Sequence, residues 1–568
     1  MGRPEKIRLG EILVQQKLLT EEQLTLALAE QKKSGRRLGR IVIEKSLVRE
    51  EQISEALARQ LNIPYVNLKH YNIKREIILK LPESAARRFR ALVLDDDGTT
   101  YKVGMADPTD VTAYDEIVRI LRRNIDIVVV LGSELMPAID RIYRRTEQIT
   151  GLAQELKAEL GETAAVDFGA LALTPGLEEA PVVKLLQTVF EDAVQARASD
   201  IHIEPHEQRL QIRFRIDGVL NPQTEADAKI ASAVALRLKL MSGLDISEKR
   251  LPQDGRFPVK VRNAQIDVRI STMPTQYGES VVMRLLNQAS GLLGLDHVGM
   301  PKTMVAKVRE VIHRQSGLIL VTGPTGSGKT TTLYAALTEL NTPERKIVTV
   351  EDPVEYRLQG INQVQVNEKI DLTFDRVLRS ALRQDPDVIL VGEMRDHPTV
   401  ETGLRAAMTG HVVLSTLHTN DAVSSPVRLL DMGAARYMVA LSLQLVLAQR
   451  LVRLICDSCT KKYKLLPNEH EWLRHELGDE VDKQPYLHGE GCPHCNGTGY
   501  QGRTGVYEML EMTGAVVEAA DQDDVQHFVR IARDQMGTGT LRRHAARLVA
   551  AGKTTVQEAM RVTQQFED

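Results

Sequence analysis

The 568-residue sequence is poor in cysteine and in aromatic residues, with four cysteines, one tryptophan and 4% Phe, Trp and Tyr. The first ten residues, MGRPEKIRLG, lack the apolar core of a signal peptide, so we do not expect a disulfide-stabilised secreted protein. A net charge of -3 and few aromatic side chains also argue against a channel for nucleic acid. We therefore expect a soluble cytoplasmic protein with no nucleic-acid partner.

The sequence also lacks a long run free of charge. Its most apolar long stretch, MVALSLQLVLAQRLVRLI from Met438 to Ile455, contains Gln444, Arg450 and Arg453. Each charge at the centre of a bilayer costs roughly 2.5 kcal/mol or more, which makes a membrane span unfavourable. We expect this stretch to form an amphipathic helix packed within the protein. Any contact with a membrane, at the periphery of an inner membrane, is then expected to occur only through partner proteins.

The chain is too long for one hydrophobic core, and its patterns predict a multidomain α/β protein. LQIRFRIDG and AQIDVRIST alternate like half-buried strands. GLILVTG, KIVTVED, DVILVGE and HVVLSTLHT are apolar throughout, as a parallel sheet covered on both faces requires. The predicted divisions are a helical repeat region at 1–61, an α+β unit at 62–150, a flexible linker at 151–180, a PAS-like α+β domain at 181–295, and an α/β domain with a helical tail at 296–568.

A glycine-rich loop, GPTGSGKT, directly follows the buried strand GLILV and precedes a helical stretch. This is the context of a phosphate-binding loop, in which backbone N–H groups and a helix N-terminus hold the phosphates. Lys329 is expected to reach the β- and γ-phosphates, and the Thr330 hydroxyl to bind Mg²⁺. The residues predicted to hold ATP and Mg²⁺ are Gly323, Pro324, Thr325, Gly326, Ser327, Gly328, Lys329, Thr330 and Thr331.

Three further predicted strands end in residues suited to phosphate chemistry. IVTVEDPVEY contains Glu351, Asp352 and Glu355, DVILVGEMRD contains Glu393, and HVVLSTLHTND contains His418. An open α/β sheet gathers its chemistry at the carboxyl ends of its strands, so these side chains are expected to meet the phosphate loop. Glu393 would lie beside Mg²⁺ and the attacking water, and the His418 imidazole would sense the γ-phosphate.

From Pro181 to the C-terminus the sequence resembles the secretion ATPases that power type IV pilus assembly and type II secretion. The matching motifs are GPTGSGKTTT, VEDPVEY, LRQDPDVILVGEMRD and TGHVVLSTLHTNDA, preceded by ASDIHIEP, RFRIDGVL and RLPQDGRF. One departure is Met394, where the family usually has Ile. The resemblance implies a RecA-like ATP hydrolase that forms a six-membered ring and works with an inner-membrane platform protein.

The same resemblance assigns roles to individual residues. Glu393 would be the general base or the residue that orients water, with Glu355 supporting it. The domain at 181–295 would supply arginines that close over the γ-phosphate, as an arginine finger does. Arg213 and Arg215 are the candidates, and solvated charges on a strand are the alternative interpretation of both.

The four cysteines form two Cys-x-x-Cys pairs separated by 32 residues, CDSC and CPHC. Four thiolates close a tetrahedral Zn²⁺ shell and leave no position for water, so we predict a structural zinc module at 456–495. The alternative is four reduced, buried cysteines. The predicted zinc ligands are Cys456, Cys459, Cys492 and Cys495. Within the family, such a module is typical of the assembly ATPases and is missing from the shorter retraction motors.

The N-terminus contains one 24-residue block twice. RLGEILVQQKLLTEEQLTLALAEQ and RLGRIVIEKSLVREEQISEALARQ are identical at 12 of 24 positions and are separated by five residues. A pair of helical hairpins explains the repeated leucines, but not the arginine and glutamine at the two ends of each block. In the first block, Thr20 and Gln23 are spaced for a capping box, whereas Arg49 replaces the cap in the second.

A ligand with two equivalent halves would explain the repeated ends, because arginine binds phosphate or a guanine edge through paired donors. The blocks resemble the tandem motif that binds cyclic di-GMP in pilus extension ATPases, most closely those of the mannose-sensitive haemagglutinin type. Lys17 and Ser46 stand where that motif often has Gly. The residues predicted to bind cyclic di-GMP are Arg8, Leu9, Gly10, Leu13, Leu18 and Gln31 in the first block, and Arg37, Leu38, Gly39, Val42, Leu47 and Gln60 in the second.

Together these patterns favour a hexameric ATPase that drives pilus extension under the control of cyclic di-GMP. The same motor in type II protein secretion is a close alternative, and a nucleic-acid translocase is a distant one. A docking function of the N-terminal domain is compatible with nucleotide sensing.

Overall fold

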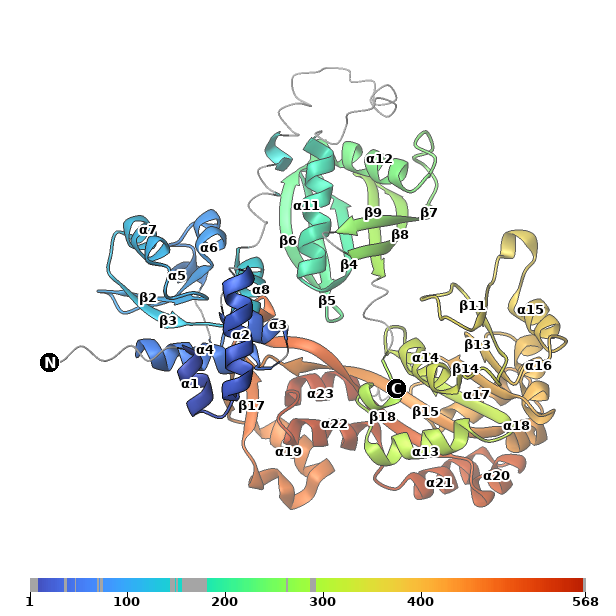
Figure 1. Cartoon of the computed structure of the whole chain (residues 1–568). Coiled ribbons are helices and arrows are strands. Elements are labelled where there is room, and N and C mark those ends of the chain that lie inside the picture. Colours follow the sequence, from blue (N-terminus) through green and yellow to red (C-terminus); the bar gives the residue numbers. More distant parts are fainter. Residues whose placement is uncertain are drawn as a thin grey trace. The chain divides into compact units, whose positions relative to one another are not determined.

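The computed structural model describes residues 9–34, 38–45, 47–68, 71, 75–143, 149, 152–155, 181–261, 264–286 and 293–564. The chain divides into two compact units (Figure 1). The first comprises 1–148, 456–461 and 489–500, and the second 149–455, 462–488 and 501–568. The predicted linker lies outside the described residues apart from 152–155. The mixed α/β architecture is confirmed, and the predicted domain boundaries stay predictions.

The tandem repeat of the first unit folds into four helices, and the helices of each block pack mainly on helices of the other block. The helices are α1 (Leu9–Gln15), α2 (Glu21–Ser34), α3 (Leu38–Glu44) and α4 (Glu50–Leu61). The capping box of α2 is confirmed, since Gln23 Oε1 accepts from the Thr20 N–H at 2.9 Å and Thr20 Oγ1 accepts from the Gln23 N–H at 3.2 Å. At α4 only half of the box forms, because Gln52 Oε1 accepts from the Arg49 N–H and Arg49 has no side-chain oxygen to return the bond.

A small mixed sheet follows in the same unit. Strands β1 and β2 are antiparallel, β2 and β3 are parallel, and helices pack on them around a core of short apolar side chains. The elements are α5 (Arg75–Ile78), α6 (Glu83–Phe89), β1 (Ala91–Asp96), β2 (Tyr101–Met105), α7 (Val111–Leu121), β3 (Ile125–Val129) and α8 (Gly132–Ile142). This is the small α+β unit that the alternation of apolar runs and helical stretches predicts.

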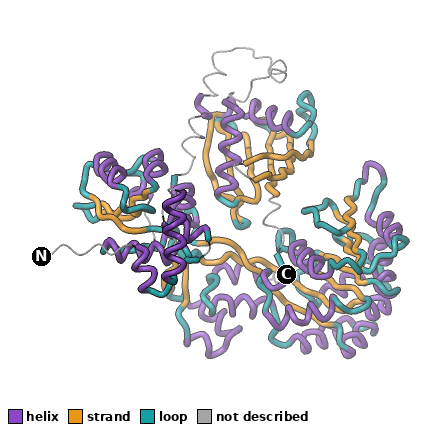
Figure 2. Tube along the Cα trace, in the orientation of Figure 1, coloured by secondary structure: helices purple, strands orange, loops and turns teal. Residues whose placement is uncertain are grey.

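The second unit begins with a six-stranded antiparallel sheet in the order β6-β5-β4-β9-β8-β7. Its elements are α11 (Pro181–Gln195), β4 (Ala198–Pro205), β5 (Arg209–Ile216), β6 (Val219–Asp227), η3 (Ala228–Ile230), α12 (Ala231–Met241), β7 (Gln253–Val261), β8 (Ala264–Thr275) and β9 (Gly278–Leu286). Helices α11 and α12 cover one face of the sheet (Figure 2). They bury Phe190 and Leu238 in one core with Phe214 and Val268 of the sheet. The alternating patterns at β5 and β8 correctly predict strands.

The same unit contains a seven-stranded sheet in the order β12-β11-β13-β14-β10-β15-β18. The six neighbouring strands from β12 to β15 are parallel, as the uniformly apolar runs predict. The strands are β10 (Gly317–Thr322), β11 (Ile347–Glu351), β12 (Asn362–Gln365), β13 (Val388–Val391), β14 (Val412–Leu417), β15 (Leu443–Ile455) and β18 (Tyr500–Glu511).

Helices cover both faces of this sheet. Between and before its strands lie η5 (Leu295–His297), α13 (Lys302–Ile312), α14 (Lys329–Leu340), η6 (Glu368–Ile370), α15 (Phe374–Ala381), α16 (His397–Met408), α17 (Ser424–Asp431) and α18 (Arg436–Ser442). The segment between β15 and β18 contains β16 (Thr460–Tyr463), α19 (Pro467–Leu477), η7 (Gly478–Lys483), β17 (Tyr486–Gly489) and η8 (Pro493–Cys495). The tail consists of α20 (Gly514–Asp521), α21 (Val525–Met536), α22 (Leu541–Ala550) and α23 (Val556–Thr563).

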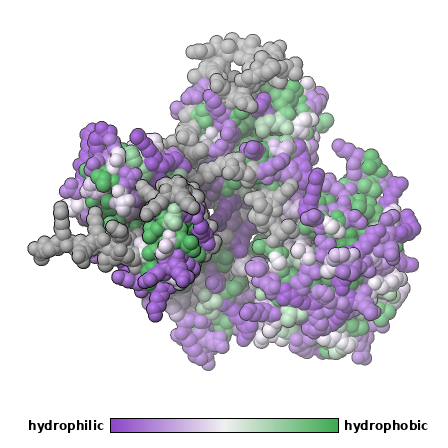
Figure 3. Space-filling view, viewed as in Figure 1, coloured by the Kyte–Doolittle hydropathy of each residue, from purple (hydrophilic) through white to green (hydrophobic). Residues whose placement is uncertain are grey.

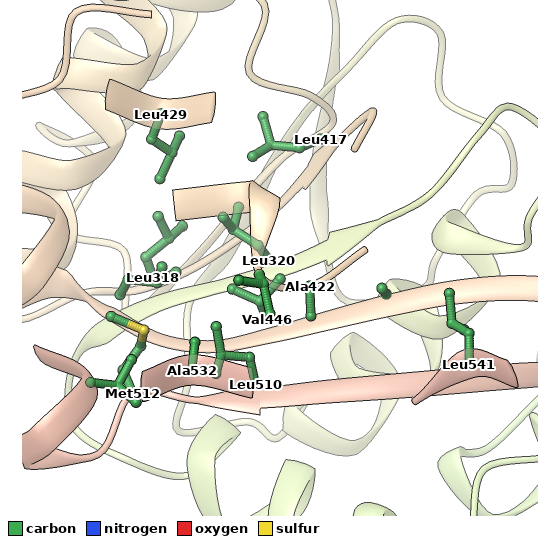
Figure 4. Close-up of a cluster of buried hydrophobic side chains, with 14 of the residues drawn as sticks. Leu318, Leu320, Leu417, Ala422, Leu429, Val446, Leu510, Met512, Ala532 and Leu541 are labelled. Atoms are coloured by element: carbon green, nitrogen blue, oxygen red, sulfur yellow. The ribbon is translucent and has the colours of Figure 1, made fainter. Parts of the chain in front are cut away.

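The core of the seven-stranded sheet explains why its strands tolerate few polar residues. Leu318 and Leu320 of β10 are fully buried and lie beside Val446 of β15 (Figure 4). Leu429 of α17 and Ala532 of α21 belong to the same cluster. Because helices pack on both faces, side chains of either orientation along a strand must be apolar.

The segment from Met438 to Ile455 corrects one prediction. It is not a helix: α18 ends at Ser442, and the next thirteen residues form strand β15. Leu445, Val446 and Leu447 are successive buried residues, which a strand covered on both faces accommodates as readily as a helix does. Among the described residues, no helix is both long and apolar enough to cross a bilayer.

Candidate functional site

The phosphate loop folds between β10 and α14 as predicted. Gly323 and Gly328 have φ values of 144° and 89°, and a Cβ on Gly323 would lie 2.4 Å from the carbonyl oxygen of Gln449. Only glycine satisfies both demands at that position. Helix α14 begins at Lys329, so its N-terminus, with free N–H groups, faces the loop.

Lys329 is held ready for an anion. Its Nζ donates to the carbonyl oxygens of Gly323 at 2.7 Å and Pro324 at 3.2 Å. Burial lowers the pKa of Lys329 to about 8, with Glu393 opposing the shift and Arg450 adding to it. Phosphate oxygens would replace the two carbonyl acceptors and raise the pKa of Lys329 again.

The residues predicted at the strand ends do come together. One cavity of about 140 Å³ is lined by Lys329, Thr330, Glu355, Glu393 and His418. In it, His418 Nε2 lies 3.4 Å from Glu393 Oε2, and Arg395 forms an ion pair with the other oxygen of Glu393. The Glu393 side chain is only 14% exposed, so its carboxylate has a fixed place beside the phosphate loop.

A further carboxylate of this cavity belongs to Glu351, which the sequence places at a strand end but to which no catalytic or binding role was assigned. Glu351, at the end of β11, is buried and accepts hydrogen bonds from the Tyr334 hydroxyl and from Thr349 Oγ1 at 2.5 Å. Gln363 Nε2 donates to Glu351 at 3.2 Å. Burial and Glu351 together raise the pKa of Tyr334, which keeps its hydroxyl a donor. The position of Glu351 at the end of an apolar strand was the signal in the sequence.

Glu355 contacts an arginine other than the two candidates. Arg269 Nη2 of β8 lies 3.1 Å from Glu355 Oε2 and donates to the Val354 carbonyl oxygen at 2.8 Å. Arg213 instead binds Glu204 through two bonds of 2.7 Å, and Arg215 lies 3.3 Å from Asp200. The part assigned to Arg213 and Arg215 therefore stays a prediction, whereas Arg269 of the six-stranded sheet contacts Glu355, which lines the cavity. In the sequence, Arg269 was recognisable only as an arginine on an alternating strand, a pattern that ordinary surface charges also produce.

The four cysteines converge as a metal site requires. All four sulfurs lie within 4.8 Å of one another, and the closest pairs are 3.7 to 3.8 Å apart. A tetrahedron with Zn–S bonds of about 2.3 Å has S–S edges of about 3.8 Å, so the arrangement fits Zn²⁺. All four cysteines are buried, and burial raises the pKa of the Cys459 thiol to about 12, a cost that a cation would offset.

The residues predicted to bind cyclic di-GMP differ in burial. Leu13 and Val42 are fully buried in the shared core of the repeat helices, whereas Leu18, Leu47, Leu38 and Gln31 are half-buried. Gly10 is buried against Leu24. Arg8 and Arg37 lie outside the described residues, as do the side chains of Leu9 and Gln60, and for Gly39 only the helical position is described. Packing thus accounts for Leu13 and Val42, and their predicted contacts with a ligand stay predictions.

Comparison with known proteins places these motifs in a family. The family model "Type II/IV secretion system protein" matches residues 176–561, and the model "MshEN domain" matches residues 61–149. The chain is 39% identical to the type IV pilus assembly ATPase PilB of Myxococcus xanthus, over 97% of this chain and 98% of that protein. It is 41% identical to the type II secretion system ATPase E of Vibrio cholerae, over 87% of this chain and 98% of that protein. The solved structure of the Legionella pneumophila ATPase DotB covers 67% of this chain and 95% of its own, with 20% identity and a TM-score of 0.50.

Proposed function

The chain belongs to the family of type II/IV secretion system proteins, and we propose that within this family it is a hexameric motor of type IV pilus extension controlled by cyclic di-GMP. It is an ATP hydrolase, as its family membership and its relatives show. The finer proposal concerns the ring, the pilus and the control by a second messenger.

Hydrolysis follows from the chain's own groups. The phosphate loop and Lys329 bind the phosphates, and Thr330 lines the same cavity at the place suited to Mg²⁺. The ion would neutralise charge on the phosphate oxygens. Glu393, fixed by Arg395 and His418, accepts a proton from the attacking water or orients it. A change at the γ-phosphate would then alter the contacts of His418 and of the arginine that contacts Glu355.

The pilus assignment is supported by a relative that covers nearly the whole chain. The M. xanthus protein aligns over 97% of this chain, whereas the V. cholerae secretion ATPase aligns over 87%. The cysteine module is the feature that the resemblance associates with assembly motors. Type II secretion remains the second candidate, because the secretion ATPase is slightly more identical where it aligns. Deletion of the gene decides: loss of surface pili supports extension, and loss of an exported enzyme with pili intact supports secretion.

Control by cyclic di-GMP is supported by one observation above all: the doubled 24-residue block directly precedes the segment that matches the MshEN domain. In the structure each block forms a short helix followed by a longer one, and the helices of the two blocks pack mainly on each other. Leu26 and Leu28 of α2 are 68% and 40% exposed, and Figure 3 shows hydrophobic residues gathered over α2. Two blocks with the same helical pattern suit a ligand that has two equivalent purine halves.

The decisive experiment measures ATP turnover of the purified full chain with and without cyclic di-GMP, beside Arg8→Ala and Arg37→Ala. Stimulation that disappears in both variants supports a sensor coupled to the motor. Calorimetric titration provides the direct binding constant. Absence of binding in the wild-type chain would reject the proposal, while binding without stimulation would assign the repeats to docking. Mass measurement with and without ATP tests the hexamer in the same preparation.

A further inference from the structure

Strand β15 extends beyond its partner β10 and lies along the phosphate loop. The two strands pair in parallel as far as Thr322 and Ala448, so Gln449 and Arg450 continue beside Gly323, where the loop begins. A Cβ on Gly323 would lie 2.4 Å from the Gln449 carbonyl oxygen and 3.2 Å from Arg450 Nη1. The Arg450 guanidinium therefore lies against the backbone of the phosphate loop.

Gln449 fixes this arrangement from the other side of the loop. Its side chain is 2% exposed, and its Oε1 accepts a hydrogen bond from Thr332 Oγ1 of α14 at 2.7 Å. Its Nε2 lies 2.8 Å from the place that a Cβ on Gly328 would occupy. Both ends of the glycine-rich loop thus pack on β15, and the position of Arg450 follows from the fold.

Arg450 also contacts the loop that follows His418. Its Nη2 donates to the Asn420 carbonyl oxygen at 3.0 Å and to Asn420 Oδ1 at 3.2 Å, and its Nη1 donates to the Gln449 carbonyl oxygen at 3.4 Å. One guanidinium therefore bridges the phosphate loop and the segment that positions His418.

The charge of Arg450 is not balanced locally. Burial lowers its pKa, and Glu508 and Asp421 oppose this shift only from a distance. Within the part of the chain that the structure describes, no carboxylate pairs with it, and its acceptors are neutral amide and carbonyl oxygens. A partly desolvated cation with neutral partners is unfavourable unless an anion joins it. Arg450 also contributes to the lowered pKa of Lys329, the other cation beside the phosphate loop.

We propose that Arg450 binds the phosphate tail of the nucleotide from the β15 side of the loop, as a second cation opposite Lys329. Because it is also bonded to Asn420, it positions the His418 segment around the same phosphates. If Arg450 served only to hold Asn420, it would not need to lie near a second cation, Lys329, or against the backbone of the phosphate loop.

The test compares binding of a fluorescent ADP with Mg²⁺ to the full chain and to Arg450→Gln and Arg450→Lys. The lost charge-assisted bond is expected to weaken binding about tenfold in R450Q and less in R450K. The dependence of the dissociation constant on salt should also become shallower in R450Q, because one ionic contact is gone. Arg314→Gln is the matched control: Arg314 bonds Gln444 on the same strand, away from the loop, and its loss should leave binding unchanged.

A role confined to holding Asn420 gives a different pattern. R450Q would then keep the wild-type ADP affinity and salt dependence even if turnover fell, and Asn420→Ala would reproduce its effect on turnover. Unchanged ADP affinity and salt dependence in R450Q overturn the proposal. If R450Q does not fold, the wild-type chain decides: MgADP should protect Arg450 from phenylglyoxal, followed by peptide mass spectrometry, whereas adenosine should not. Equal labelling with and without MgADP also overturns it.

Discussion

Arg269 lies 3.1 Å from Glu355, so an arginine of the six-stranded sheet already contacts the acidic segment of the ATPase cavity. The Arg269 side chain is 18% exposed and also donates to the Val354 carbonyl oxygen. Arg213 and Arg215, the candidates from sequence, are engaged within their own sheet. Arg269 is therefore a specific candidate for the arginine that closes over the γ-phosphate.

Arg269→Gln should therefore reduce turnover more than Arg213→Gln does. An arginine that stabilises charge on the transferring phosphoryl group is worth about a thousandfold in kcat. Arg213→Gln breaks the pair with Glu204 and should lower the melting temperature with little change in kcat. Steady-state kinetics of both variants decide the matter, and the opposite ranking would return the role to Arg213.

Glu393→Gln should abolish most hydrolysis while nucleotide binding survives. The amide keeps the shape of the side chain but cannot accept a proton from water, so kcat should fall by about a hundredfold or more. Glu401→Gln, on the exposed face of α16, is the control and should hydrolyse ATP normally. Turnover and ADP affinity measured together separate the two effects. Full activity in Glu393→Gln would remove Glu393 from its role.

The sequence predicted those site residues that lie directly after an apolar strand. The phosphate loop, Glu393 and His418 each follow an apolar strand, and a parallel sheet brings such ends to one edge. Arg269 and Arg450 were not predictable in this way, because their roles depend on which loop lies opposite. The prediction of a helix from Met438 to Ile455 was wrong for a related reason. Continuous apolarity fits a buried strand and a buried helix alike, and only the pairing with β10 distinguishes them.

Nucleotide binding should weaken as the pH rises above about 8, the pKa of Lys329 in the free enzyme. Phosphate beside the ammonium raises that pKa in the complex, so binding takes up a proton once free Lys329 is neutral. Affinity should be constant below this pKa and then fall by at most about tenfold per pH unit. Fluorescent ADP titrations across this range measure it. Lys329→Arg should bind with no such dependence, since arginine stays charged. A flat wild-type profile would contradict the shift.

Zinc removal should unfold the cysteine module and leave the phosphate site chemically intact. The four sulfurs are spaced as the edges of a ZnS₄ tetrahedron, and structural zinc sites contribute folding free energy directly.

Elemental analysis should find one zinc per chain, and Cys459→Ser should lose it and melt at a lower temperature. Ser458→Ala, next to the ligand but without a sulfur, is the control and should retain the metal. Wild-type protein without zinc, yet with the same melting temperature as Cys459→Ser, would mean four reduced cysteines packed as ordinary apolar residues.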